Sequence, residues 1–256
     1  MNRVIPTTKL RNFYSLLRDL TTSTQLEILN DFSGKKLNRL VDIYYESKKH
    51  FSHYSNVDEP FISNAKRGDL PNKVSKIKNT NDITSLLEQK NKTNNKVLSN
   101  SNFDFRYINR EVSTIRTSRS EFDTGKSAKS SGLGGLDFIG ISTNNIPILG
   151  EIKVNNDEDP FFALIQLLTY LSELTTQNQI KRINKHKLFG INIDDDSKFY
   201  LYIMFHHNQK LKTGWKEIYN KTKLLSDNLK HKIIEVEKIV YLNINDTASN
   251  FEITEY

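Results

Sequence analysis

The chain has 256 residues, enough for one large domain or for a domain with an additional segment, and a formal net charge of +7. It contains no cysteine, which excludes disulfide bonds, thiolate zinc sites and iron–sulfur clusters. No apolar run is long enough to span a bilayer, and the first residues lack the apolar core of a signal peptide, so we expect a soluble cytoplasmic protein with no membrane association.

The positive charge is concentrated in the N-terminal half. Residues 1–130 carry 23 Lys and Arg against 14 Asp and Glu, whereas residues 131–256 carry 14 against 16. A basic half beside a mildly acidic half is the pattern expected of a protein that binds a polyanion. Ordinary solvated lysine would give the same totals, so charge alone leaves both interpretations open.

The first 80 residues are predicted to be helical and then irregular. Leu10, Phe13 and Leu17 fall at helical spacing, as do Leu37, Leu40 and Tyr44, so residues 9–50 are expected to form two or three helices. Residues 51–81 lose this periodicity and contain prolines and a glycine. We therefore predict that residues 1–80 form a helical N-terminal appendage with a linker, for target recognition, dimerisation or partner docking, and that residues 81–256 form the main domain.

The main domain is predicted to alternate helices and strands. In chain order we expect a helix over residues 82–98, strands over 103–116, 135–142 and 146–154, and a helix over 161–174. Strands near 187–193 and 199–206, a helix from about 215 to 234 and a strand near 239–244 complete the order. Asp159 is placed to cap the helix over 161–174, and Pro160 suits its first turn. This order predicts an α/β (α+β) fold, with a mixed sheet flanked by helices.

Polar groups interrupt the two apolar strands at 135–154. Asp137 lies in the first strand, and Glu151 and Lys153 lie in the second, where their spacing of two places them on one face. A three-residue loop, Thr143–Asn145, would oppose Asp137 to Glu151, because directly opposed residues share a face. The same register would gather Leu136, Phe138, Ile148 and Ile152 on the opposite, core-facing side.

These residue types suit a magnesium site. Mg²⁺ prefers oxygen ligands and keeps several waters, so Asp137, Glu151 and the backbone carbonyl of Ile152 could hold it. Such a metal lowers the pKa of a bound water and stabilises charge on a phosphate under attack. Lys153 could orient that water or neutralise charge that develops at phosphorus.

The spacing of these residues resembles the PD-(D/E)xK nuclease superfamily, in which an Asp is followed, after a spacer, by Glu-x-Lys on the next strand. Gln166 and Tyr170, one turn apart on the next helix, resemble the Gln-x-x-x-Tyr motif of the RecB-like and phage-exonuclease branch. Leu136 replaces the family's proline. The resemblance implies a restriction-endonuclease-like fold, catalysis by Asp137, Glu151, Lys153, Gln166 and Tyr170, and Mg²⁺ as cofactor, with Mn²⁺ as a substitute. Family members often add a carboxylate from the preceding helix, for which Glu88 is the nearest candidate.

The resemblance also predicts the substrate and the setting. It implies a metal-dependent DNA nuclease of restriction, phage defence or DNA repair, acting alone, as a homodimer or with a partner protein. Basic residues around the first strand and the following loop could contact DNA phosphates: Arg106, Arg110, Arg116, Arg119, Lys126 and Lys129. A non-catalytic or partner-activated DNA-binding or assembly protein on the same fold is the alternative. Endonuclease or exonuclease action, and DNA or RNA as substrate, stay open.

Overall fold

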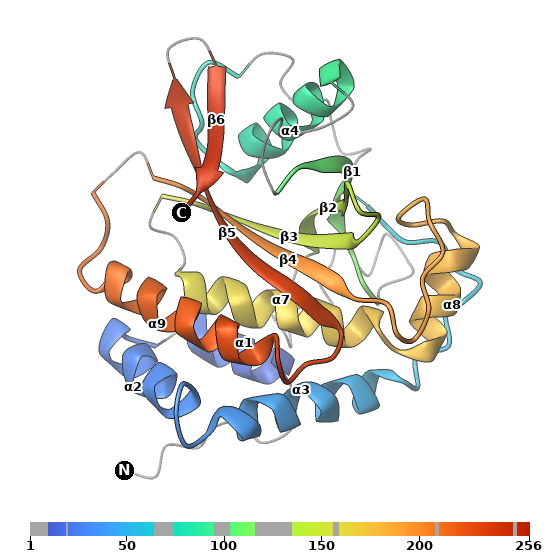
Figure 1. Cartoon of the computed structure of the whole chain (residues 1–256), viewed down its shortest axis with the longest axis horizontal. Coiled ribbons are helices and arrows are strands. Elements are labelled where there is room, and N and C mark those ends of the chain that lie inside the picture. The colour runs from blue at the N-terminus through green and yellow to red at the C-terminus, as the bar shows by residue number, and fades with distance from the viewer. Residues whose placement is uncertain are drawn as a thin grey trace.

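Helices and a mixed sheet surround one fully buried helix, α7 (Figure 1). The computed structural model describes residues 10–18, 20–63, 74–94, 103–115, 135–155, 159–207, 210–247 and 250–256. Its helices are α1 (Leu10–Arg18), α2 (Thr22–Phe32), α3 (Leu37–Phe51), α4 (Thr80–Asn94), α7 (Pro160–Leu174), α8 (Gln177–Lys185) and α9 (Trp215–Leu229). Its strands are β1 (Phe105–Val112), β2 (Leu136–Ser142), β3 (Pro147–Val154), β4 (Phe199–His206), β5 (Val236–Thr247) and β6 (Asn250–Glu255).

The six strands form one sheet in the order β1-β2-β3-β4-β5-β6. The pairs β1–β2, β2–β3 and β5–β6 are antiparallel, whereas β3–β4 and β4–β5 are parallel. The parallel β3–β4 pair requires a crossover, which α7 and α8 provide. The predicted α/β (α+β) architecture, a mixed sheet flanked by helices, is therefore confirmed. Among the described residues, no helix is long and apolar enough to cross a membrane.

The hairpin between β2 and β3 has the predicted register. Phe138 pairs with Gly150, and Gly140 pairs with Ile148. Ser142 N–H donates to the Ile146 carbonyl at 2.9 Å, which leaves three residues in the loop. Asn145 in this loop has φ 61°, a left-handed conformation that asparagine tolerates. One residue beyond the Phe138–Gly150 pair, Asp137 lies opposite Glu151, as the pattern predicts.

Both faces of the sheet are buried. On one face, α7 packs with α1, α2, α3 and α9 over the larger hydrophobic cluster, which includes Leu149, Ile203 and Phe205. On the other face, α4 packs over a second cluster that includes Phe138, Ile148 and Ile152. Those three residues lie together as predicted, but Leu136 joins the larger cluster. The face that carries Glu151 and Lys153 is thus itself a core face.

Helix α7 is buried on all sides because it lies between two layers. All fifteen of its residues are buried. Asp159 caps it as predicted, accepting a hydrogen bond from Phe162 N–H at 2.8 Å, and Pro160 occupies the first turn. Most of its residues are apolar, as expected of a helix that the rest of the fold surrounds.

The N-terminal helices contribute to this same core. The Phe13 ring of α1 lies 6.0 Å from the Phe161 ring of α7 and 5.5 Å from the Phe32 ring of α2. Figure 1 shows α1, α2 and α3 beside α7 and α9 on one side of the sheet. The division at residue 80 stays a prediction, but α1 to α3 are packed into the main domain.

The structure differs from the sequence prediction in three elements. The segment 187–193, predicted as a strand, is a series of turns: Lys187 and Gly190 have positive φ, and Asn184 bonds both the N–H and the carbonyl of Ile193. The polar helix α8 was missed because only Ile180 and Ile183 give it an apolar side. The edge strand β6 was also missed.

Candidate active site

Asp137 and Glu151 meet where β2 and β3 separate. The main-chain ladder ends at Phe138–Gly150, and beyond it the Ile152 N–H donates to the Asp137 carboxylate at 2.7 Å. The N–H and the carbonyl of one residue point to the same side of an antiparallel strand, so the Ile152 carbonyl is also directed towards β2. The register thus places three possible oxygen ligands at this end of the hairpin: the Asp137 and Glu151 carboxylates and the Ile152 carbonyl.

Lys153 connects this acid pair to helix α7. Its ammonium donates to Glu151 Oε1 at 2.8 Å and to Gln166 Oε1 at 3.1 Å. Glu151 is 2% exposed and Lys153 is 5% exposed. The structure therefore brings together three of the predicted catalytic side chains, from two different elements, in a nearly closed space.

Tyr170 completes the predicted set one turn after Gln166. It is 1% exposed, and burial raises its pKa well above the ordinary value, with the nearby Glu151 charge raising it further and the Gln166 side chain lowering it. The Gln166 side chain lies beside its hydroxyl, one turn earlier on α7. Because its pKa is raised, Tyr170 keeps its proton at neutral pH and can act as a hydrogen-bond donor.

Helices α1, α2 and α7 cover the site around Lys153. The Lys153 ammonium lies 5.2 Å from the centre of the Phe162 ring, and the Tyr14 ring centre lies 4.3 Å from the Phe162 ring centre. The cap residue Asp159 is also close: burial raises its pKa, whereas the Phe162 N–H, Gln25 and the Lys153 charge lower it. The sequence identifies Asp159 as a helix cap but gives no sign that it lies beside Lys153.

A second buried ion pair lies further along α7. The guanidinium of Arg11 pairs with the Glu173 carboxylate, with Nη2 at 2.7 Å from Oε2, and the Thr114 hydroxyl donates to the same carboxylate. Glu173 is 0% exposed. Sequence reasoning missed all three residues; a Glu seven positions after Gln166, on the same helical face, was the available signal.

Glu88 does not join the acid pair. Its helix, α4, packs through Ile83 and Leu87 on the opposite face of the sheet. Glu88 itself pairs with Lys92 at 2.6 Å and lies near enough to Tyr107 to raise the pKa of that phenol. The structure thus gives Glu88 a place away from Glu151.

The structure describes two of the six predicted DNA-contacting residues, and it places them apart. Arg106 is opposite Ile141 and Arg110 is opposite Phe138, with an irregularity in β1 between them. Ile141 and Phe138 point to opposite faces, so the two arginines do as well. Arg106 is exposed and shares the face of Asp137, whereas Arg110 is buried on the other face. Arg116, Arg119, Lys126 and Lys129 lie outside the described residues.

The donor set suits a hard divalent cation. Two carboxylates and a carbonyl are oxygen ligands of the kind that Mg²⁺ uses, and it fills its remaining positions with water or substrate. No group of three or more His, Cys, Asp or Glu side chains in the described part of the chain is arranged to hold a metal ion. Any metal here would therefore be held by Asp137, Glu151 and main chain, with an open coordination sphere.

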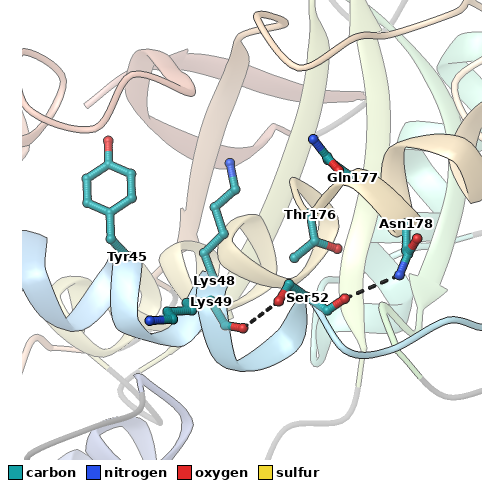
Figure 2. Close-up of a pocket in the computed structure, with 7 residues that line it drawn as sticks. All are labelled: Tyr45, Lys48, Lys49, Ser52, Thr176, Gln177 and Asn178. Carbon is teal, nitrogen blue, oxygen red and sulfur yellow. Dashed lines mark hydrogen bonds between the residues drawn. The ribbon is translucent and has the colours of Figure 1, made fainter.

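A cavity of about 540 Å³ lies elsewhere (Figure 2). It is lined by residues from the end of α3 and the start of α8: Tyr45, Lys48, Lys49, Ser52, Thr176, Gln177 and Asn178. Leu174, the last residue of α7, is eight residues beyond Gln166, which corresponds to roughly 12 Å along the helix, and Thr176 lies beyond that end. Lys48 is neutralised by Glu235 at 2.5 Å. The cavity is separate from the acid–lysine cluster.

Comparisons with protein-family models, with curated proteins and with solved structures give no match for this chain.

Proposed function

We propose that this protein is a Mg²⁺-dependent nuclease that hydrolyses phosphodiester bonds in DNA, in restriction, phage defence or DNA repair. The observation that carries the proposal is the convergence of Asp137, Glu151 and Lys153 on one end of a hairpin, with Gln166 bonded to the lysine. Burying such groups is unfavourable without a compensating role. The resemblance to the PD-(D/E)xK pattern supports the same reading.

Each side chain has a role that follows from its contacts. Asp137, Glu151 and the Ile152 carbonyl would hold the metal, which, when bound, activates water and stabilises charge on the phosphate. Lys153 would orient the attacking water or neutralise charge on the phosphate, and Gln166 holds its ammonium in place. Tyr170, protonated at neutral pH, can donate its O–H to a phosphate oxygen. The near-complete burial of the cluster restricts bulk water.

Cleavage assays on linear, circular and branched DNA, with Mg²⁺ and with EDTA, test the proposal. We expect Mg²⁺-dependent cleavage by the wild type and none by Asp137→Asn. The matched control is Asp195→Asn, the same chemical change at an exposed turn residue, which should cleave like the wild type. DNA binding without cleavage by the wild type would favour the non-catalytic alternative, and neither binding nor cleavage would reject both.

A further inference from the structure

Three polar side chains of α7 form one continuous stripe. Gln166, Tyr170 and Glu173 are spaced by four and three residues and therefore lie on the same face of the helix. At one end Gln166 bonds Lys153, and at the other Glu173 bonds Arg11 and Thr114. Tyr170 lies between Gln166 and Glu173. It is near enough to both charges for Glu151 to raise its pKa and for Arg11 to lower it.

Arg11 lies where three helices meet. It belongs to α1, pairs with Glu173 of α7 and places its guanidinium 5.7 Å from the Phe51 ring at the end of α3. The adjacent Leu10 N–H donates to Ser47 Oγ of α3 at 2.8 Å, which fixes the start of α1. The position of Arg11 beside α7 is thus determined by the packing of α1 and α3.

Stability alone is a poor reason for this ion pair. A buried ion pair is often no more stable than apolar side chains of similar volume, because both charges lose their hydration. The surrounding cluster is strongly apolar, with Leu167, Leu171 and Leu174 of the same helix in it. The pair does provide direction, because a two-point guanidinium–carboxylate contact fixes the rotation of α7 about its axis.

We infer that Arg11 and Glu173 are positioning residues of the proposed active site, which hold Tyr170 and Gln166 in register with Glu151 and Lys153. They touch no substrate and act through the α7 stripe. The inference rests on the proposed function for its catalytic consequence, whereas the coupling between the ion pair and Lys153 can be measured without it. It also makes α1, predicted as part of an appendage, an essential component of the site.

The test removes the ion pair without leaving a buried charge or an unpaired hydroxyl. The triple variant Arg11→Met, Thr114→Val, Glu173→Leu replaces all three polar side chains by apolar ones of similar shape, a change that is commonly neutral or stabilising. The matched control is Lys48→Met with Glu235→Leu, which removes a partly buried ion pair between α3 and the residue that precedes β5, beside the cavity of Figure 2.

Three quantities are measured on both variants: the melting temperature, the single-turnover rate of DNA cleavage, and the rate of acetylation of Lys153 followed by mass spectrometry. We expect the triple variant to keep its melting temperature, to cleave at least about ten-fold more slowly, and to acetylate Lys153 at least about three-fold faster. The control should match the wild type in both rates.

The two ways of failing are distinguishable. Cleavage and Lys153 acetylation that both stay at wild-type rates in a folded triple variant would overturn the inference and leave the proposed function untouched. A wild type that does not cleave DNA would reject the proposed function, and the acetylation rates would then decide the positioning role: faster acetylation in the triple variant alone supports it, and equal rates overturn it.

Discussion

Two buried cations in this protein are held in different ways. Arg182 of α8, 0% exposed, donates to the main-chain carbonyls of Glu59, Pro60 and Thr114, and its guanidinium lies 3.9 Å from the centre of the Phe61 ring. Lys153 of β3, 5% exposed, donates to the side chains of Glu151 and Gln166. These Arg182 bonds go to main chain, and a further one goes to the Gln179 side chain at 3.1 Å, whereas both of these Lys153 bonds go to side chains.

This difference separates structure from candidate function. The hydrogen bonds from Arg182 to main-chain carbonyls are buried or partly buried, so Arg182 satisfies a segment whose polar groups would otherwise be unpaired. A carboxylate and an amide can instead change partner when a metal or a phosphate enters. An acid–lysine pair inside an apolar core adds little stability, so we interpret the Lys153 cluster as a functional site and the Arg182 cluster as a brace.

The largest expected effect is on the acid pair. Asp137→Asn and Glu151→Gln keep the side-chain shape but remove a charge that a metal requires. We expect single-turnover cleavage to fall by about a thousand-fold or more, roughly 4 kcal/mol of barrier, with the circular dichroism spectrum unchanged. Either variant retaining near-wild-type cleavage with Mg²⁺ would remove that residue from the site.

Substitution of Arg182 should lower stability and leave cleavage unchanged. Arg182→Met leaves several buried carbonyls without their donor, and we expect a loss of about 3 kcal/mol in the free energy of unfolding, measured by urea denaturation. The cleavage rate per folded molecule should stay at the wild-type value. A folded Arg182→Met protein that cleaves slowly would break the distinction between the two cations.

Changes at Gln166 and Tyr170 should slow cleavage less than changes at the acid pair. Gln166→Ala removes the amide that accepts from Lys153, and Tyr170→Phe removes only a hydroxyl beside that amide. We expect each to lower cleavage about ten-fold, roughly 1.4 kcal/mol, with little change in melting temperature. Unchanged cleavage together with a lowered melting temperature would make the two residues structural.

The smallest expected effect is the contribution of Asp159 to the pH dependence of stability. Burial raises the pKa of Asp159 in the folded protein, so its ionisation opposes folding: the stability is greatest below the unfolded pKa and is lost as pH rises through the folded value. An asparagine at this position would still cap α7 but would not ionise. We expect the stability of Asp159→Asn relative to wild type to increase from about pH 3 to neutral pH. A difference that is constant with pH would show that Asp159 ionises without hindrance.

Local patterns predicted the hairpin and α7 because their signals are contained in a few neighbouring residues. The spacing of Asp137 and Glu151, with Asn145 in the loop, specifies the register, and Asp159 specifies the start of α7. The Arg11–Glu173 pair could not be predicted, because its members are 162 residues apart and meet only through helix packing. The opposite orientations of Arg106 and Arg110 depend on an irregularity in β1 that their even spacing conceals.

Calorimetric titration with Mn²⁺ tests whether Asp137 and Glu151 form one metal site. Mn²⁺ should substitute for Mg²⁺ at an oxygen-ligand site and generally binds more tightly to carboxylates. We predict one saturable site per chain in the wild type, lost in both Asp137→Asn and Glu151→Gln and retained in Asp195→Asn. Saturable binding of equal affinity in all four proteins, or none in the wild type, would contradict the account.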